Sequence, residues 1–420
     1  MKGRPTVQFM RAIPAVDLAG LRSRFPALSR THNGHPVAYF DWPGGTQVPQ
    51  SVVDAMSDYL LHHNANTHWQ YPTSEETDAL IADSRKAIAE FLNAEPEEIA
   101  FGANMTTLTF HLARALARGW VSGDEVVVTE LDHHANIAPW RALEREKGIV
   151  VRTAKMDPAT GTVSLDEIGR LIGDRTRLVA VGAASNALGT ISDVSSVTQL
   201  ARRHGAEVFV DAVHYAPHQL VDVEMIDCEY LACSAYKFYG PHIGILYGKR
   251  DRIDALDFPR LEPAPQIAPE RAETGTQNHE GIVGAAAAVD FLASFAPETE
   301  SRRDLLIAVY DTIHFQGTMQ VQKLWGGLST IDRVTLYGPK PGTSPRTPTV
   351  SFTMKGMSTN DIARGLAKQG LFVSNGDFYA ATVIERLGQA ADGVVRVGCS
   401  CYTTMEEVDR LLDAVRELAG

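Results

Sequence analysis

Hydrophobic residues between about residues 75 and 250 occur in short runs that alternate with stretches of helical periodicity. The runs are rich in β-branched or aromatic residues and are predicted to be strands, at 98–101, 125–129, 177–181, 207–211, 229–233 and 243–247. Between the first two runs, Leu108, Leu112 and Leu116 recur at helical spacing, and Gly119 follows as a typical helix stop. Strands that alternate with helices predict parallel βαβ units in a sheet covered on both faces.

The pattern changes after residue 258. The proline-rich stretch 259–269 predicts an irregular segment, and two helical stretches follow at about 281–291 and 298–315. A second proline and glycine cluster, at 338–345, precedes a set of short elements. We expect strands at 349–354, 371–374 and 394–397, and helices at 359–369 and 405–418. From about residue 300 onward the sequence therefore predicts a smaller α+β domain.

The length of 420 residues agrees with two or three domains at about 150 residues each. We expect an N-terminal arm and helix at 1–40 that pack with the small domain, a large domain at 41–300 and a small domain at 301–420. A chain of this size can bury a large core without disulfide bonds.

Charge and cysteine usage narrow the class of protein. With 39 Lys and Arg against 51 Asp and Glu, the net charge of −12 argues against a broad nucleic-acid surface, though not against a local anion site. No apolar run approaches the roughly 18 residues of a membrane helix, and no apolar block follows Lys2, Arg4 and Arg11 as in a secretory signal. Four clustered cysteines fit a reducing compartment: Cys228, Cys233, Cys399 and Cys401. We therefore expect a cytoplasmic protein without a membrane or nucleic-acid partner.

Ligands of parallel sheets bind at the carboxyl ends of the strands, so the residues that follow each predicted strand are the candidates for chemistry. After strand 98–101, Asn104, Met105 and Thr106 lead into a helix. Free amides at a helix N-terminus bind phosphate, and Thr106 or Thr107 could add a hydroxyl. The segment is neither a Walker loop nor a dinucleotide glycine motif. By itself it more often marks an ordinary turn capped by Asn104 or Thr106.

Two adjacent histidines, His133 and His134, follow strand 125–129. Adjacent side chains point to opposite sides, so a shared metal ion is not expected. A flat imidazole could stack on an aromatic cofactor, although this segment alone would favour a surface histidine pair in a loop.

Asp211 ends the buried strand 207–211, where a carboxylate is costly unless it is paired. It could hold a cationic ring nitrogen or a metal, or cap the next turn. His214 and His218 are four residues apart, but Pro217 breaks the helix that zinc-type spacing requires. We therefore expect no metal site.

Lys237 follows strand 229–233 in an apolar and aromatic setting, between Tyr236 and Phe238. Desolvation there would lower the pKa of the ammonium and make the amine a usable nucleophile. The alternative is a lysine that extends its ammonium into solvent. A phosphate cradle, a stacking ring, an acid for a pyridinium nitrogen and a Schiff-base lysine are together what pyridoxal 5'-phosphate requires.

The order of these segments resembles the class-V aminotransferase and cysteine desulfurase group of fold-type I pyridoxal-phosphate enzymes. The resemblance extends nearly end to end, from Asp17 to the helix at 405–412, and its most specific segments are 133–140, 185–190 and 234–241. It implies an α/β fold in which a large domain holds a mainly parallel seven-stranded sheet between helices. A smaller α+β C-terminal domain completes the fold.

The resemblance also implies a catalytic role for three residues. Lys237 would hold the cofactor as an aldimine and later move the α-proton as general base and acid. Asp211 would pair with the protonated pyridine nitrogen, and His133 would stack on the ring face.

Further contacts follow from the same resemblance. The remaining cofactor contacts would come from Asn186 at the ring hydroxyl, from Met105, Thr106 and Ser234 at the phosphate, and from His214 and Tyr236 nearby. Arg396 would bind the substrate carboxylate, a task for which a bidentate guanidinium is suited, and Asn186 and Tyr379 would also line the substrate pocket. Thr276 would reach the phosphate of the partner subunit, which implies a homodimer with active sites at the subunit interface.

The chain departs from cysteine desulfurases at several positions. Those enzymes carry a persulfide-forming cysteine on a loop near the small domain, whereas residues 373–381 contain none, and Ser374 stands near the position of an arginine. His214 replaces a frequent glutamine, and Tyr236 replaces a frequent histidine. Cys399 and Cys401 follow Arg396 closely, but small buried cysteines are the expectation for both. Sulfur transfer to an acceptor protein is therefore doubtful.

We thus expect a pyridoxal-phosphate enzyme that acts on a small L-amino acid, with cysteine desulfurase-like or C–S lyase chemistry that does not use the loop cysteine. Transamination by a class-V aminotransferase, or epimerisation, is the alternative, because the same residues serve all three reactions. A non-catalytic homologue would have lost Lys237 or Asp211, and both are present.

Overall fold

The fold is described from a computed structural model in which residues 20–296 and 301–420 are described. Several predicted features lie outside these residues: Lys2, Arg4, Arg11, Asp17 and the first three residues of the predicted helix 298–315. No helix in the described ranges is both long and apolar enough to cross a membrane.

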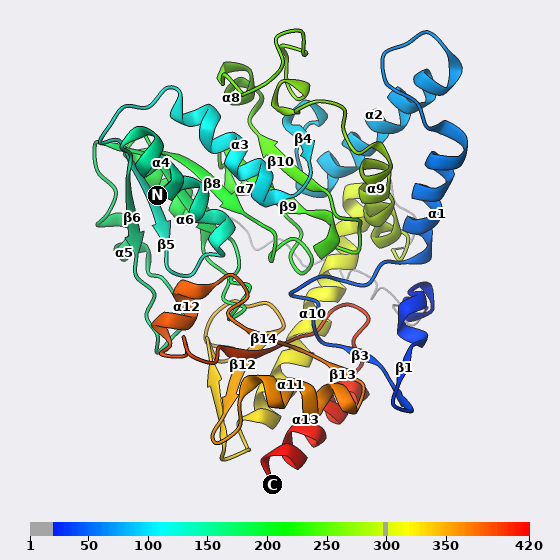
Figure 1. The fold of residues 1–420 in the computed structure, drawn as a ribbon, viewed down its shortest axis with the longest axis vertical. Coiled ribbons are helices and arrows are strands. Elements are labelled where there is room, and N and C mark those ends of the chain that lie inside the picture. Colours follow the sequence, from blue (N-terminus) through cyan, green and yellow to red (C-terminus); the bar gives the residue numbers. More distant parts are fainter. Residues whose placement is uncertain (1–19, 297–300) are drawn as a thin grey trace, which may run out of the picture.

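A seven-stranded sheet, in the order β4-β10-β9-β8-β7-β5-β6, forms the centre of the larger part of the molecule (Figure 1). Strands β5 to β9 pair in parallel, and β10 is antiparallel to both of its neighbours. The strands are β4 (Ile99–Gly102), β5 (Glu125–Thr129), β6 (Val150–Ala154), β7 (Thr176–Gly182), β8 (Glu207–Asp211), β9 (Tyr230–Ser234) and β10 (Gly244–Gly248). All six predicted runs are strands within one residue or so, and the mainly parallel sheet is confirmed. Of the seven strands of this sheet, β6 was not predicted.

Helices cover both faces of this sheet because alternate strand residues point to opposite sides. On one face, Val127 and Val179 share a core with Ile88 and Val197; on the other, Val128 shares a core with residues of the opposite helices. The first face is covered by α2 (Pro72–Leu92), α6 (Val194–Arg203), α7 (Val223–Ile226) and α9 (His279–Ala293), and the second by α3 (Met105–Ala117), α4 (Ala138–Lys147) and α8 (Arg250–Ala255). Helices α1 (Gln50–Asp58) and α5 (Leu165–Gly169) also contribute to the first core, with Val52 and Ile168.

A four-stranded antiparallel sheet, in the order β11-β12-β15-β14, forms the smaller part. Its strands are β11 (Val334–Tyr337), β12 (Thr349–Met354), β14 (Ser374–Gly376) and β15 (Val394–Gly398). Its core is completed by α11 (Thr359–Lys368) and α13 (Met405–Ala419). The remaining elements are α12 (Ala381–Arg386), the hairpin of β1 (Thr31–His32) and β2 (His35–Pro36), and the parallel pair of β3 (Ala38–Tyr39) and β13 (Leu371–Phe372).

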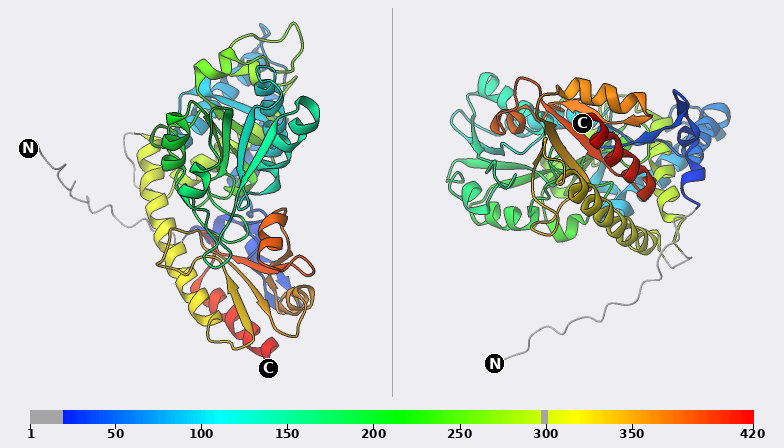
Figure 2. Two further views of the ribbon diagram at one scale, coloured as in Figure 1. Left: turned by 90° about the vertical axis from the view of Figure 1, so that its left-hand side faces the viewer. Right: turned by 90° about the horizontal axis from the view of Figure 1, so that it is seen from below.

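Helix α10 (Arg302–Leu328) connects the two parts and runs along one side of both (Figure 2). Leu306 and Val309 belong to the core beneath the large sheet, whereas Val321 and Leu324 belong to the core of the small sheet. One helix thus contributes to two cores, and the predicted domain limits at 40/41 and 300/301 remain predictions.

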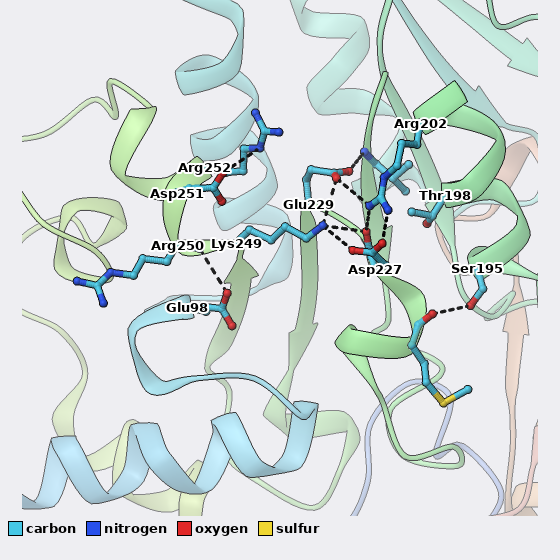
Figure 3. A network of polar contacts seen from close by, with 12 residues as sticks. Glu98, Ser195, Thr198, Arg202, Asp227, Glu229, Lys249, Arg250, Asp251 and Arg252 are labelled. Atoms are coloured by element: carbon cyan, nitrogen blue, oxygen red, sulfur yellow. Dashed lines mark hydrogen bonds and ion pairs between the residues drawn. The ribbon is translucent and has the colours of Figure 1, made fainter. Parts of the chain in front are cut away.

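A network of ion pairs ties the amino edge of the large sheet together (Figure 3). Lys249 Nζ donates to Asp227 Oδ1 at 2.7 Å, and Arg202 Nη2 donates to the Asp227 carbonyl at 2.7 Å. Glu229 is buried and accepts from the Val208 amide at 2.9 Å. The two cations hold the pKa of Asp227 well below its usual range. These polar contacts thus join the starts of β8 and β9 to the end of β10.

Candidate active site

A cavity of about 820 Å³ lies at the carboxyl edge of the large sheet, where the small sheet meets it. This volume is within the usual range for small-molecule sites. Its walls come from the segments that follow β4, β5, β7, β8 and β9, from Pro43 and Gly44 near the N-terminus, and from Phe378, Tyr379 and Arg396 of the smaller part. Both parts of the molecule therefore contribute to one cavity.

Lys237 ends a short 3₁₀ turn, Ala235–Lys237, directly after β9, and is only 7% exposed. Its ammonium donates to the Pro43 carbonyl and lies 4.9 Å from the centre of the Tyr236 ring. Burial and the nearby Arg396 guanidinium lower its pKa to about 7. Near neutral pH a substantial fraction of this amine is therefore unprotonated, as a nucleophile or base requires.

Asp211 closes β8 and is buried, with Oδ1 accepting from the Val213 amide at 2.9 Å. Burial raises the pKa of this carboxyl to about 6, against the opposing effect of Lys237. A buried carboxylate with so few partners favours a cationic group placed against it.

His133 follows β5 and caps the 3₁₀ turn His134–Asn136, because its Nδ1 accepts from the Ala135 amide at 3.0 Å. This bond assigns the remaining ring proton to Nε2. Burial, with Lys237 nearby, lowers the pKa of His133 to about 4, so the ring is neutral at physiological pH. A neutral, fixed imidazole is suited to stacking rather than to acid catalysis.

The N-terminus of α3 borders the cavity. Asn104 caps the helix by accepting from the Thr107 amide at 2.9 Å, and Ser234 accepts from the Met105 amide at 3.0 Å. Thr106 is exposed in the first turn and lines the cavity. Amides and hydroxyls at the start of a 13-residue helix suit a phosphate group.

Arg396, in β15, is the buried cation of the cavity. Its Nη1 donates to the Asn186 carbonyl at 3.0 Å and its Nε to Ser374 Oγ at 3.2 Å. The guanidinium carbon lies 3.9 Å from the centre of the Phe378 ring. Burial lowers the pKa of Arg396 to about 10, which leaves it charged near neutral pH.

Residues 376–381 form a connection across the cavity from β14 to α12. The Phe378 carbonyl accepts from Asn186 Nδ2 at 3.0 Å, and the Tyr379 carbonyl accepts from the His134 amide at 2.8 Å. Both Phe378 and Tyr379 have φ of +56°, a conformation that is uncommon for large side chains. Two hydrogen bonds from the large sheet hold the connection in this conformation.

His214 follows β8 and is stacked on Trp42, with ring centres 4.6 Å apart. Its Nε2 lies 3.1 Å from Thr349 Oγ1, whereas its Nδ1 is buried without a hydrogen-bond partner. Asn186 Oδ1 is a second buried atom without a partner, and both residues line the cavity. Two unpartnered polar atoms in one wall favour a polar ligand between them.

Eleven of the predicted site residues line this one cavity: Met105, Thr106, His133, Asn186, Asp211, His214, Ser234, Tyr236, Lys237, Tyr379 and Arg396. Thr276 does not; it is exposed and lines a separate hollow of about 570 Å³ with His68 and Gln277. The structure thus places the residues, and their roles remain predictions.

Two carboxylates near the site were not assigned a role from the sequence. Asp132 is buried, accepts from the Thr129 amide at 3.0 Å and the Gly182 amide at 2.5 Å, and so joins the ends of β5 and β7 beside His133. Asp41 lies 3.7 Å from Arg396 Nη2. The Pro-Gly-Gly turn after Asp41 was the one available sequence signal for that segment.

All four cysteines are buried, and none lines the cavity. Cys399 belongs to the core of the small sheet and Cys401 to the core of the large sheet, as expected of small buried residues. Burial raises the thiol pKa of both, that of Cys401 to about 12. No thiolate is therefore available in the cavity.

These donors fit pyridoxal phosphate. A low-pKa amine, a buried carboxylate, a neutral imidazole and a helix N-terminus surround one space, and Asn186 Oδ1 and His214 Nδ1 supply unpartnered polar atoms to its wall. Lys237 would anchor the aldehyde carbon and Asp211 the ring nitrogen, with the phosphate at the start of α3.

Comparisons with known proteins agree with this geometry. The sequence model of the aminotransferase class-V family matches residues 38–411. A cysteine desulfurase of Synechococcus elongatus is 34% identical over 99% of this chain, which spans 66% of that protein. A cysteine desulfurase of Pectobacterium atrosepticum is 31% identical over 95% of this chain and 97% of its own length.

Solved structures give the same result. The apo structure of a cysteine desulfurase from Thermococcus onnurineus has a TM-score of 0.83 and 29% identity, and covers 94% of this chain and 98% of its own. A cysteine desulfurase of Escherichia coli, with an S-sulfonic acid, has a TM-score of 0.83 and 26% identity over 96% and 98% of the two chains. The chain belongs to the class-V aminotransferase family of pyridoxal-phosphate-dependent enzymes and is cysteine desulfurase-like.

Proposed function

We propose that this enzyme uses pyridoxal phosphate bound to Lys237 to cleave a C–S or related bond at the β-carbon of a small L-amino acid. The supporting observation is one cavity that gathers Lys237, Asp211, His133 and Arg396 and that no cysteine lines. In such a cavity the leaving sulfur would depart as sulfide instead of passing to a protein thiol.

The cofactor, when bound, supplies an electron sink for the negative charge that develops at the α-carbon. Arg396 binds the substrate carboxylate and sets the orientation of the α-carbon. Lys237, whose pKa is about 7, would take the α-proton and, as general acid, pass it to the departing sulfur. Asp211 stabilises a protonated ring nitrogen, and His133 holds the ring face without exchanging a proton.

Transamination or epimerisation is the second candidate. The absence of a cavity thiol supports it, because neither reaction needs a sulfur acceptor. The same arginine and lysine would serve it, with a proton returned either to the cofactor carbon or to the opposite face of the α-carbon.

A homodimer is part of the proposal. Thr276 is exposed and lies outside the cavity of its own chain, as expected of a residue that acts on the site of a second copy. We propose no sulfur-acceptor protein.

Product analysis with L-cysteine tests the proposal. The purified, cofactor-loaded protein is mixed with L-cysteine, and the carbon product is identified by mass spectrometry. Pyruvate with sulfide and ammonia indicates β-elimination, which we expect. Alanine with released sulfur indicates desulfuration without the loop cysteine, and absence of turnover makes transamination or epimerisation the leading function.

Lys237→Ala is the matched control for the anchor. The wild-type protein should show a visible absorbance band that borohydride removes, and the variant should lack the band. A variant that keeps the band and its borohydride sensitivity contradicts the assignment of Lys237.

A further inference from the structure

The guanidinium of Arg396 already has an anionic neighbour from its own chain. Asp41 Oδ1 lies 3.7 Å from Arg396 Nη2, at the start of the turn that also contains Pro43 and Gly44. This separation is longer than the 2.7–3.2 Å of a direct N–H···O bond, so the two charges are adjacent but not joined by a direct hydrogen bond.

The donors of Arg396 are only partly used. A guanidinium carries five N–H groups, and two of its nitrogens donate at hydrogen-bond distance, Nε to Ser374 and Nη1 to the Asn186 carbonyl. Nη2 donates no hydrogen bond to the described residues, and its ion-pair neighbour is Asp41, at 3.7 Å. A carboxylate can accept from two such nitrogens at once, so a better-placed acceptor than Asp41 would bind here.

The Asp41 carboxylate lies where it can rotate away from Arg396 and into solvent. Its side chain is 47% exposed, whereas that of Arg396 is 4% exposed. Asp41 Oδ1 is itself buried and has no hydrogen-bond partner. Gly44 makes room for the group, because a Cβ at that position would lie 2.9 Å from each carboxylate oxygen. Little is therefore lost when this carboxylate rotates toward water.

We propose that Asp41 is a positioning residue that serves as the resident counter-ion of Arg396, and that the α-carboxylate of the substrate displaces it on binding. The inference rests on the proposed role of Arg396 in binding the substrate carboxylate. Asp41 keeps the buried guanidinium neutralised in the free enzyme, since an unpaired buried cation is costly. Asp41 also makes the site selective for anionic ligands, because only a negatively charged group can replace its carboxylate at Arg396. A neutral amide does not displace it.

The test measures binding of propionate, an unreactive monocarboxylate, to the cofactor-loaded protein by ligand-observed NMR. Asp41→Asn keeps the shape of the side chain and removes its charge. We expect the Kd of propionate to fall about three- to tenfold and weak binding of neutral propionamide to stay unchanged. Asp54→Asn, on α1 outside the cavity, is the matched control and should leave the Kd of propionate unchanged.

A double-mutant cycle separates the two claims. In an Arg396→Gln background, Asp41→Asn should no longer change the Kd of propionate. If Arg396→Gln alone leaves propionate binding intact, the proposed role of Arg396 fails, and the inference fails with it. If Arg396→Gln weakens propionate binding but Asp41→Asn does not strengthen it, only the role of Asp41 is overturned.

Asp41→Ala provides a second variant if Asp41→Asn unfolds. It removes the charge and the side-chain oxygens together, and it should strengthen propionate binding in the same direction. An unchanged or weaker affinity in this folded variant also overturns the inference, because a merely structural role for Asp41 predicts weaker binding of both ligands.

Discussion

At the scale of single residues, the site contains groups whose pKa values are shifted by burial in the fold. Lys237 and His133 are bases whose charged forms are disfavoured by burial, and Asp211 and Asp132 are acids affected in the same way. Burial raises the pKa of Asp132 to about 7 and that of Asp211 to about 6. Lys237, His133 and Asp211 line one cavity and Asp132 is adjacent to His133, and such clustering of shifted groups is typical of functional sites.

The shifted pKa of Lys237 predicts a pH-dependent stability of the cofactor-free protein. Between about pH 7 and about pH 10 the unfolded chain binds a proton at Lys237 that the folded chain has lost, so this residue's contribution to stability rises with pH. Relative to Lys237→Met, the free energy of unfolding should rise by up to about 4 kcal/mol over that range. Urea titrations of both proteins at several pH values measure it, and parallel pH profiles would contradict it.

The placement of candidate residues was predictable where they directly follow a strand in the sequence. Lys237, Asp211 and His133 come directly after strands of the large sheet, so their shared edge followed from parallel topology alone. Asp41 and Asp132 were missed because their partners are distant in sequence or are backbone amides. Arg396 and Gly182 become their neighbours only when the strands are assembled.

At the scale of elements, β10 approaches the N-terminus of α3, where the phosphate of the cofactor is proposed to bind. Gly244 begins β10 and faces Asn104, the residue that caps α3; a Cβ on Gly244 would lie 2.4 Å from the Asn104 carbonyl carbon. Backbone atoms cannot yield as a flexible side chain can, so only glycine fits here.

Gly244→Ala should therefore weaken both stability and cofactor binding. We expect a loss of about 1–3 kcal/mol in the free energy of unfolding and at least a tenfold higher Kd for pyridoxal phosphate. Gly326→Ala, in α10 with open space around it, is the control and should be neutral or slightly stabilising. Chemical denaturation and absorbance titration measure the two quantities; equal effects of both substitutions would contradict the argument.

Elements were predictable where their periodicity was regular. Helix α10 extends beyond the predicted end at residue 315, because Gly317, Gly326 and Gly327 resemble stop signals but lie within the helix, with Gly317 close to Pro348. The edge strand β6 was missed because Arg152 and Thr153 interrupt its hydrophobic residues, and only Ala154 of its five residues is fully buried. The antiparallel direction of β10 depends on the short connection between β9 and β10, and the hydrophobic pattern of the sequence does not predict the direction of a strand.

At the scale of the whole molecule, the cavity needs both sheets, and the proposed function needs two chains. We expect the protein to sediment at twice the chain mass. Thr276→Ala should lower the affinity for the cofactor. A mixed dimer of one Thr276→Ala chain and one Lys237→Ala chain should contain one complete site, because Lys237 of the first chain and Thr276 of the second would meet in it. Cofactor content after co-expression and gel filtration measures this. A monomer, or no recovery in the mixture, would contradict it.

The position of Lys237 between two central strands has a consequence for local opening. The connection from Ser234 to Gly244 is short, and these two residues are themselves a pair in the β9–β10 register, so the lysine lies in a hairpin anchored in the middle of the sheet. Amides of such a hairpin exchange with solvent only when the central strands separate. The proposed cofactor anchor would thus depend on the large sheet, and a chain whose small sheet has frayed should still show the visible absorbance of the bound cofactor.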